Sequence, residues 1–419
     1  MTTEAQKVTL FGNFGTQNLG NECTLQAIIH NLRKYLPHAA VNCICTDPKE
    51  TSERHNIAAS PMSARYRCRK ESGSTVRPGH NHPLVTLLRR MLIRIPNELL
   101  HWVRAFKTLR GTTMLVMAGT GMLGDFGIGP FELHYEIFKW SLLAKLRGSK
   151  LLFVSVGVGE LKHPLNRWFV KSALSLADYR SYRDSSSKEF LARIGFNACD
   201  DFVYPDLAFS LPHAEIAGRQ NGHATGPVIG LGLMGYYGQA CNRARGGAIY
   251  HAYLENVAAF VTWLLDHGYT VRLLVGDVSY DSGVPQDVIQ LLRERGVRYD
   301  ETRLIHEPVS SVEQLLSQLA TTKLVVASRF HNVLLALMLT KPVVSISYYE
   351  RKNESLMAEM GLAEYCQHIE RLDIDHLIDH FVRLEEQTKV VKPHLEQKTG
   401  EYQDALDQQY RLIFNQALA

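Results

Sequence analysis

The feature that most constrains the fold is a repeated alternation of short apolar runs and longer helical segments. In the first half of the chain the predicted strands cover Val8–Phe11, Val41–Cys45, Met114–Met117, Leu151–Val156, Asp178–Tyr182 and Val203–Asp206. In the second half they cover Val228–Leu233, Val271–Val275, Leu304–Ile305, Leu324–Ala327 and Val343–Ile346. Between them lie segments whose apolar residues recur at helical spacing, such as residues 22–35 and 132–147. Strands that alternate with helices in this way predict an α/β protein with parallel sheets covered on both faces.

The 419 residues are enough for two domains, and the composition changes once near the middle of the chain. We predict an N-terminal Rossmann-like domain over residues 1–212 and a C-terminal one over 228–390. Residues 213–227 are rich in Gly, His and Asn and predict a linker, and residues 391–419 a C-terminal helix that can pack back on the N-terminal domain. Two such halves predict the GT-B arrangement, with the active site in the interdomain cleft.

Composition and charge exclude several classes of function. The 46 Lys and Arg against 42 Asp and Glu leave a formal charge of +4, too small and too spread out to indicate nucleic-acid binding. The apolar runs are strand-sized, and the N-terminus has no signal-peptide pattern, so we expect a cytoplasmic protein without transmembrane helices. The seven cysteines form no CxxC pair, which indicates neither a zinc site nor a disulfide framework.

Two glycine-rich loops follow predicted strands. The first runs from Gly12 to Glu22 and lacks the spacing of a dinucleotide or Walker loop. It can bring the backbone close to a ligand at the start of a helix, or it can be a tight turn with Asn21 as the N-cap. The second runs from Gly119 to Asp125 and is either a ligand loop or a flexible connection.

Two further blocks place cations at strand-to-helix turns. Arg183 precedes a predicted helix, where its guanidinium can bind phosphate or carboxylate, or can pair with Asp184 on the surface. Ser328-Arg329-Phe330-His331 follows a buried strand and sets a permanent cation beside an imidazole that titrates near neutrality, although an isolated His is more often structural. Such residues favour a small, multiply charged anion as substrate.

These four blocks, in this order, resemble those of the polysaccharide pyruvyl transferase family. Family members are similar to GT-B glycosyltransferases in fold, and they transfer pyruvate from phosphoenolpyruvate to two hydroxyls of a sugar, forming a cyclic ketal and releasing phosphate. The chain departs from the family pattern at Asn21, which stands where Asp is usual, and at Thr120, which interrupts a run of three glycines. Asn21 removes a carboxylate that could act on the acceptor, and Thr120 narrows the loop.

The resemblance implies a role for each candidate residue. His331 would be the general acid or the base, with Glu22 as a second base candidate. The N-terminal domain would hold the acceptor and the C-terminal domain the donor. Donor binding would fall to Arg183, Arg329, Lys352 and Ser328, and acceptor binding to Asn18, Gly20, Asn21, Gly121 and Asp125. The scheme needs no metal and no cofactor, with phosphoenolpyruvate as co-substrate and a lipid-linked or nucleotide-linked glycan as acceptor.

The segment from Leu84 to Arg110 combines six basic residues with Leu, Met, Trp and Phe. A basic amphipathic helix can lie on an anionic membrane, here the inner face of the cytoplasmic membrane, although the same pattern fits a packed helix with a solvated Arg face and Pro96 would kink it. Two other functions stay open for the whole chain. It could be a glycosyltransferase that uses a nucleotide sugar, or a catalytically silent family member in a glycan assembly complex.

Overall fold

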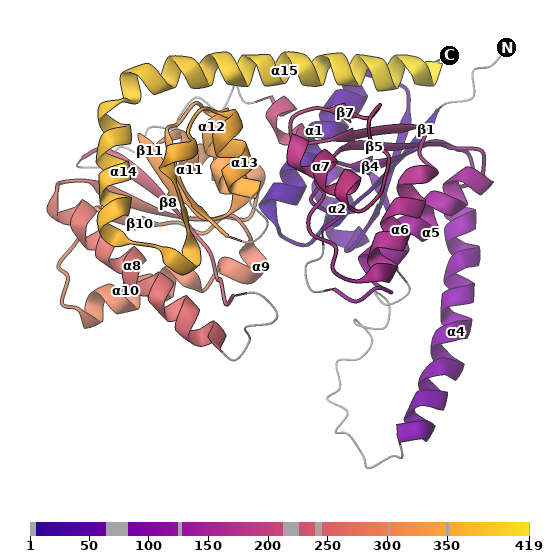
Figure 1. Ribbon diagram of the computed structural model, residues 1–419, viewed down its shortest axis with the longest axis horizontal. Coiled ribbons are helices and arrows are strands. Elements are labelled where there is room, and N and C mark those ends of the chain that lie inside the picture. The colour runs from indigo at the N-terminus through magenta and orange to yellow at the C-terminus, as the bar shows by residue number, and fades with distance from the viewer. Residues whose placement is uncertain are drawn as a thin grey trace. The chain divides into compact units, whose positions relative to one another are not determined.

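The computed structural model describes residues 6–63, 83–124, 128–212, 226–238, 245–300, 302–348 and 352–418. The chain forms two compact units (Figure 1). The first unit contains Met1–Thr16, Ile29–Val203 and Leu412–Ala419, and the second contains Gln17–Ile28 and Tyr204–Arg411. Most of the predicted linker, residues 213–225, lies outside the described residues.

The first unit is built on a seven-stranded sheet with the order β3-β2-β1-β4-β5-β6-β7, and all its strand pairs are parallel. Its strands are β1 (Lys7–Phe11), β2 (Ala40–Cys45), β3 (Ala58–Pro61), β4 (Thr112–Ala118), β5 (Lys150–Val156), β6 (Tyr179–Tyr182) and β7 (Phe202–Val203). Its helices are α1 (Leu19–Tyr35), α2 (Pro48–His55), α4 (Pro83–Thr108), α5 (Leu133–Leu146), α6 (Pro164–Ser175) and α7 (Ser185–Arg193), although the first turns of α1 belong to the second unit. The strand order reverses between β1 and β4, so the glycine loops that follow these two strands lie at the switch point where open α/β sheets bind ligands.

The second unit repeats this plan on a six-stranded parallel sheet with the order β10-β9-β8-β11-β12-β13. Its strands are β8 (Val228–Leu233), β9 (Thr270–Val275), β10 (Leu304–His306), β11 (Leu324–Ala327), β12 (Val343–Ser347) and β13 (Cys366–His368). Its helices are α8 (Gly246–Asp266), α9 (Val278–Asp281), α10 (Val284–Glu294), α11 (Val312–Ala320), α12 (Phe330–Met338), α13 (Lys352–Glu359), α14 (Ile374–Glu386) and the long α15 (Thr388–Leu418). Here the order reverses between β8 and β11, which puts the Ser-Arg-Phe-His block after β11 at the switch point.

The long helix α15 contributes to both units. Tyr410 is fully buried in the second unit, and its hydroxyl lies 3.1 Å from Ser210 Oγ. Phe414, which belongs to the first unit, packs against Tyr35 with a centroid distance of 6.1 Å. In each unit, therefore, a buried aromatic side chain of α15 contacts residues of that same unit.

A buried lysine holds the C-terminal half of α4 in the first unit. Lys139 on α5 has no exposed side-chain surface, and its ammonium lies 2.7 Å from both Glu98 and Glu136. It also lies 3.0 Å from Nδ1 of His101, and burial together with its charge lowers the pKa of His101 to about 4. A buried cation needs such partners, so this part of α4 is a packed helix, as one of the two interpretations of the sequence predicted.

Candidate functional site

The turn after β11 is held in place by buried hydrogen bonds. The Ser328 backbone N–H donates to Gly232 O at 3.0 Å, and its hydroxyl lies 3.1 Å from the Tyr253 hydroxyl. Asn353 Nδ2 donates to Ser328 O, also at 3.0 Å. Ser328 is fully buried, and these hydrogen bonds satisfy its polar groups. They fix the backbone from which the side chains of Arg329 and His331 project.

Arg329 is paired with a carboxylate that the sequence analysis missed. Its Nε and Nη2 donate to Oδ2 and Oδ1 of Asp281, each at 2.7 Å, and Asp281 Oδ1 also accepts from the backbone N–H of Gly235 at 2.9 Å. Burial opposes the charge on Arg329, but the hydrogen bonds and the charge of Asp281 outweigh it and raise the pKa of the guanidinium. Arg329 is therefore a fixed cation whose orientation is set by a bidentate pair.

His331 packs against the first turn of α1. A Cβ added at Gly20 would lie 1.9 Å from His331 Nδ1 and 2.6 Å from His331 Cβ. No side chain can occupy that space, so glycine at position 20 is required for the imidazole to lie where it does. The opening loop and the Ser-Arg-Phe-His block, 308 residues apart from Gly20 to Ser328 in sequence, meet here within the second unit.

Asn18 joins the start of α1 to the end of β9. Its Oδ1 accepts from the backbone N–H groups of Gly20 and Asn21, at 3.1 and 3.3 Å, so Asn18 rather than the predicted Asn21 caps the helix. Its Nδ2 donates to Oδ2 of Asp277 at 2.7 Å. Two backbone hydrogen bonds, Leu19 N–H to Gly276 O at 3.1 Å and Val278 N–H to Gln17 O at 3.0 Å, complete the junction.

Asp277 is the second carboxylate that the sequence analysis missed. Burial, reinforced by the nearby charge of Asp281, raises its pKa, and the charge of Arg329 only partly opposes this. The sequence did contain a signal, because Gly276-Asp277 follows a predicted strand directly, as the other blocks do. Gly276 also gives space to the buried Asn332 side chain, since a Cβ at Gly276 would lie 2.4 Å from Asn332 Oδ1.

Two other predicted residues of this unit lie on helix starts. Glu22 is fully buried in the first turn of α1, where its backbone N–H donates to Asn18 O at 3.1 Å. Lys352 is the half-buried first residue of α13. Their predicted roles, a second base and a donor contact, stay predictions.

The first unit presents the other predicted arginine. Arg183 follows β6 and is only 6% exposed, so it is not the surface residue that one of the two interpretations of the sequence described. Its Nε lies 3.4 Å from Asp184 Oδ2, and a Cβ at Gly157 would lie 2.6 Å from that Nε. Asp184 caps α7 by accepting from Ser187 N–H at 2.6 Å, and although burial opposes its charge, Arg183 and these hydrogen bonds lower its pKa.

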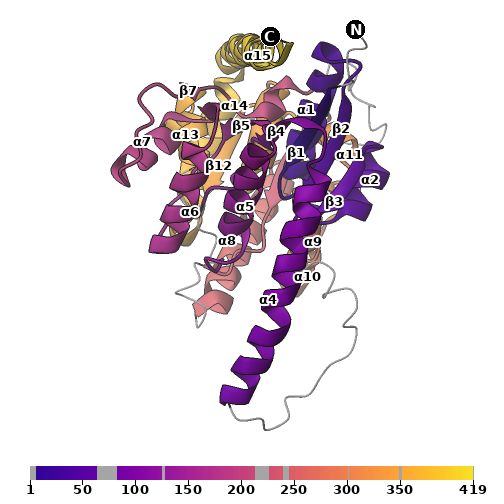
Figure 2. The same cartoon turned by 90° about the vertical axis from the view of Figure 1, so that its right-hand side faces the viewer.

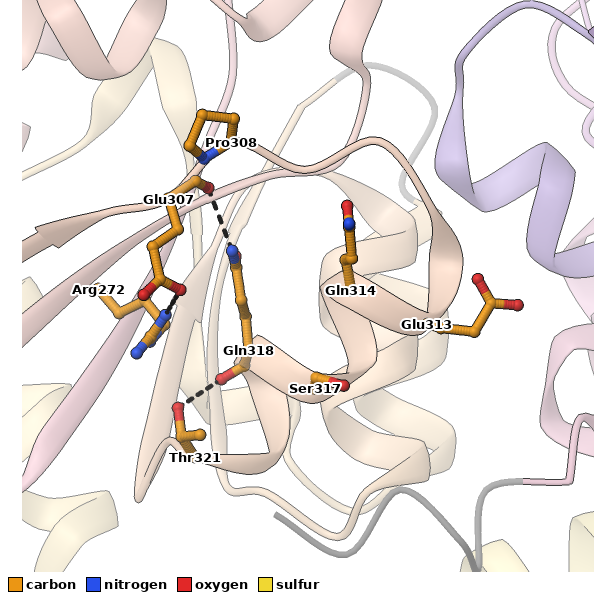
Figure 3. Close-up of a pocket in the computed structure, with 8 residues that line it drawn as sticks. All are labelled: Arg272, Glu307, Pro308, Glu313, Gln314, Ser317, Gln318 and Thr321. Atoms are coloured by element: carbon orange, nitrogen blue, oxygen red, sulfur yellow. Dashed lines mark hydrogen bonds and ion pairs between the residues drawn. The ribbon is translucent and has the colours of Figure 1, made fainter. Parts of the chain in front are cut away.

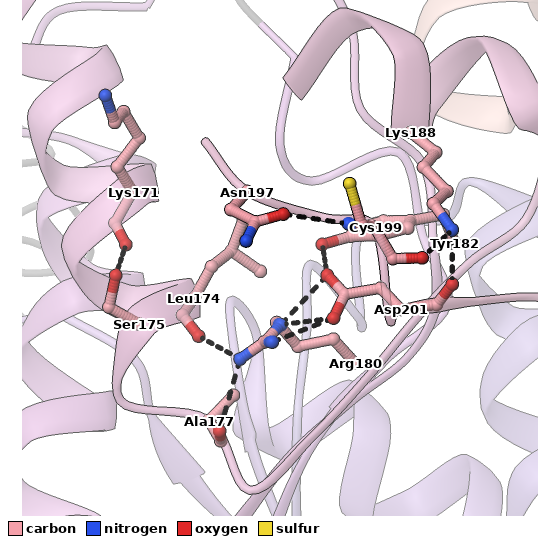
Figure 4. A network of polar contacts seen from close by, with 10 residues as sticks. All are labelled: Lys171, Leu174, Ser175, Ala177, Arg180, Tyr182, Lys188, Asn197, Cys199 and Asp201. Carbon is pink, nitrogen blue, oxygen red and sulfur yellow. Dashed lines mark hydrogen bonds and ion pairs between the residues drawn. The ribbon is translucent and has the colours of Figure 1, made fainter. Parts of the chain in front are cut away.

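A polar network joins β6 and α7 to the segment around Asp201 (Figure 4). Arg180 donates to Asp201 through Nε at 2.8 and 2.9 Å, and the Tyr182 hydroxyl donates to the same carboxylate at 2.7 Å. Lys188 on α7 donates to the backbone oxygens of Cys199 and Asp201, at 2.9 and 2.7 Å. Because Arg183 lies between Tyr182 and α7, both of its flanks are fixed.

The second glycine loop is paired with the loop after β5. Gly157 N–H donates to Thr120 O at 3.2 Å, and Leu123 N–H donates to Gly157 O at 3.3 Å. Thr120 is buried, and Gly121 is half-buried in this structure. The loop is therefore ordered by backbone pairing rather than flexible, while the predicted acceptor residue Asp125 lies outside the described residues.

A cavity of about 500 Å³ lies elsewhere in the second unit, beside α11 (Figure 3). It is lined by Arg272, Glu307, Pro308, Glu313, Gln314, Ser317, Gln318 and Thr321. Arg272 is paired with Glu307 at 2.6 Å, and Gln318 donates to Glu307 O at 3.1 Å. None of the predicted site residues lines this cavity, so it is not the candidate site.

Over the described ranges, no group of three or more His, Cys, Asp and Glu side chains is arranged to hold a metal ion. Among the helices whose residues are described, none combines the length and the apolar character that crossing a membrane requires.

The chain matches a known protein family. A family model described as polysaccharide pyruvyl transferase matches residues 18–350. None of the curated protein sequences matches the chain significantly.

Solved structures show the same fold at low sequence identity. A putative UDP-N-acetylglucosamine 2-epimerase from Listeria monocytogenes is 14% identical with a TM-score of 0.59, over 96% of this chain and 93% of its own. UDP-GlcNAc 2-epimerase from Neisseria meningitidis, bound to UDP-GlcNAc, is 12% identical with a TM-score of 0.59, over 99% of each chain. A glycosyltransferase from Rickettsia africae is 10% identical with a TM-score of 0.54, again over 99% of each chain. The predicted fold class, two Rossmann-like domains of the GT-B type, is confirmed.

Proposed function

Because the chain belongs to the polysaccharide pyruvyl transferase family, we propose that it transfers pyruvate from phosphoenolpyruvate to two hydroxyls of a sugar in a polysaccharide or its precursor. The product would be a cyclic ketal, with phosphate as the second product. The observation that carries this proposal is the turn after β11, where the oriented guanidinium of Arg329 lies two residues from His331 at a switch point. A cation and a titratable group at this position suit an anionic donor whose reaction needs proton transfer.

The chemistry assigns a role to each group. Phosphoenolpyruvate carries a carboxylate and a phosphate on an enol carbon, and an alcohol adds there when the neighbouring methylene carbon is protonated. Arg329 and Lys352 in the second unit would bind the anionic groups and compensate charge as phosphate leaves. In the first unit, Arg183 would be a further anion-binding cation. His331 would move the proton to or from the reacting atoms. No metal or further cofactor is needed in this scheme.

The experiment that tests this function is an assay with defined substrates. The purified chain would be incubated with phosphoenolpyruvate and a panel of lipid-linked and nucleotide-linked glycans, with phosphate release and product mass measured. We expect phosphate release that depends on the acceptor, and an acceptor that gains the mass of a pyruvyl ketal. A gain of one hexose from a nucleotide sugar would support the glycosyltransferase alternative instead. No product with any donor would support a catalytically silent family member.

We also propose that the acceptor is reached at an anionic membrane surface, on the cytoplasmic side. Helices α4, α5 and α6 lie side by side in the first unit (Figure 2). The described part of α4 exposes Leu99 and Val103, and α6 exposes Trp168, each by more than half of its surface. Arg104 and Lys107 are exposed beside them, and exposed apolar side chains flanked by cations fit the interface of an anionic bilayer. Trp102, in contrast, is turned inward and donates to the Tyr135 hydroxyl at 2.8 Å.

Replacing Leu99 and Val103 together by Asp is expected to abolish binding to anionic liposomes. The change removes two apolar side chains that would be buried in the interface, and the anionic lipid repels the two new carboxylates. Co-sedimentation with vesicles containing phosphatidylglycerol measures this, at low and high salt. The control is Val390→Asp, since Val390 is 75% exposed but lies on α15. A wild-type chain that stays in the supernatant, or a control that loses binding equally, rules the membrane contact out.

A further inference from the structure

The candidate site of the second unit is a closed ring of contacts. Asn18 is bonded to Asp277, and the Asp281 backbone N–H donates to Asp277 O at 2.8 Å across α9. Asp281 is bonded to Arg329, His331 follows two residues later, and its ring packs on Gly20. Gly20 N–H in turn donates to Asn18 Oδ1 at 3.1 Å, which closes the ring. Asp277 and His331 therefore flank the same first turn of α1.

The charges in this ring do not balance if every carboxyl is ionised. Asp277 and Asp281 are 4% and 0% exposed, and the charge of Arg329 opposes the effect of burial on Asp277 without cancelling it. The Nε and Nη2 hydrogen bonds of Arg329 both go to Asp281, so the one guanidinium charge is bonded to Asp281 and acts on Asp277 only from a distance. A second buried carboxylate next to a neutralised pair is better accommodated as the uncharged acid. Burial accordingly raises the pKa of Asp277.

The hydrogen bonds also indicate which oxygen carries the proton. Asn18 Oδ1 accepts from two backbone N–H groups of α1, which fixes the orientation of the amide and directs its NH₂ group toward Asp277 Oδ2. Asp277 Oδ2 is thus an acceptor, the carbonyl oxygen of the acid. The proton belongs on Oδ1, which accepts only a long hydrogen bond, from Tyr280 N–H at 3.3 Å, within the part of the chain that the structure describes.

We propose that Asp277 is a further catalytic residue of this site, a neutral carboxylic acid that protonates the methylene carbon of phosphoenolpyruvate while His331 acts as the base. The inference rests on the proposed function. Asp281, fully buried and committed to Arg329, is a positioning residue, whereas Asp277 retains some exposed surface.

The step balances in atoms and electrons. The Oδ1–H bond of Asp277 breaks as the π electrons of the enol form a C–H bond, which converts the methylene into a methyl group. The acceptor hydroxyl bonds to the adjacent carbon, and its proton passes to His331. Phosphate then leaves with the electron pair of its carbon–oxygen bond and receives the proton from His331. The second hydroxyl closes the ketal, and its proton restores the acid on Asp277.

The test is Asp277→Asn, which keeps the size of the side chain and an acceptor oxygen but has no acidic proton. We expect turnover to fall by roughly 10²–10⁴-fold with phosphoenolpyruvate binding retained, the range typical of a lost general acid. The control is Asp373→Asn, because Asp373 caps α14 in the same way, accepting from His376 N–H at 2.9 Å. The control should have wild-type turnover.

The pH dependence separates a proton donor from a structural residue. A group whose pKa is raised acts as an acid below that pKa, so wild-type turnover should decline as pH rises through it. The charged groups that face Asp277 are Asp281 from α9 and Arg329 from the turn after β11, with the neutral Asn18 from the start of α1. Arg329 stays charged throughout. The alkaline decline should persist in Asp277→Glu and vanish from any residual activity of Asp277→Asn.

Each result decides between the two proposals. A wild-type chain that releases no phosphate from phosphoenolpyruvate overturns the proposed function, and this inference with it. An active wild type with Asp277→Asn within about threefold of it, or with the alkaline decline unchanged, overturns the inference alone. If Asp277→Asn fails to fold, the pH profiles of the wild type and of Asp277→Glu still test the inference. A turnover that stays constant up to about pH 9 in both proteins contradicts an acid at this position.

Discussion

Gly20→Ala is expected to lower turnover by roughly 10²-fold, at the lower end of the loss expected for His331→Ala, although alanine adds only one methyl group. That methyl would lie 1.9 Å from His331 Nδ1 and 2.0 Å from Cγ, so the imidazole or the start of α1 has to move. Removing the imidazole itself should cost roughly 10²–10⁴-fold in kcat, and displacing it by about 1 Å roughly 10²-fold. Overpacking should also lower the free energy of unfolding by about 1–3 kcal/mol.

Gly247→Ala is the matched control for this prediction. Gly247 lies in the exposed first turn of α8, and a Cβ there meets nothing within 4 Å. In a helix the same change should leave turnover intact and raise the free energy of unfolding by up to about 1 kcal/mol. Phosphate release and thermal unfolding, measured on all three variants, check both effects. Gly20→Ala with wild-type turnover would show that the position of His331 against α1 is irrelevant to the reaction.

Arg329→Ala is expected to lose both turnover and stability. The change removes the donor-binding cation and leaves the fully buried Asp281 without its bidentate partner. Breaking a buried ion pair from one side costs about 3–5 kcal/mol of folding free energy. A simple loss of activity in this variant would therefore not distinguish a binding residue from a structural one.

The double variant Arg329→Ala with Asp281→Ala separates the two effects. The double variant has no unpaired buried carboxylate, so most of the lost folding free energy should return. Removing both partners of a buried ion pair is far less destabilising than removing one. Turnover should remain absent, since the cation is still missing. Denaturant unfolding and the phosphate assay measure the two quantities. Recovery of turnover together with stability would remove Arg329 from donor binding and leave it a structural role.

The sequence predicted the strands and the turns that carry chemistry with good fidelity. Apolar runs such as Leu324–Ala327 became strands, here β11 with the same bounds, because an apolar run of this length ending in a polar turn has few other ways to be buried. The Ser328 to His331 block was found for the same reason, since it follows a buried strand directly. The family was also identified from these local blocks, and the match over residues 18–350 confirms it.

The partners of the site residues could not be predicted in this way. Asp281 lies 48 positions before Arg329, and Asp277 lies 259 positions after Asn18. An Asp that caps a short helix and an Asp that pairs with a buried guanidinium look alike in sequence, because each depends on the other side chains around it. Whether Arg183 lies on the surface or is buried against Gly157 was open for the same reason.

The sequence by itself therefore determined the two parallel sheets, the family, and the positions of Arg183, Arg329 and His331 at strand-to-helix turns. These depend on local periodicity and on glycine placement, which neighbouring residues specify. Only the tertiary structure decided that residues 17–28 join the second unit, that Gly20 must be glycine, and that Asp277 and Asp281 surround Arg329. Desolvation, steric exclusion and charge pairing act between residues that are close in space, and in this chain those residues are from tens to hundreds of positions apart.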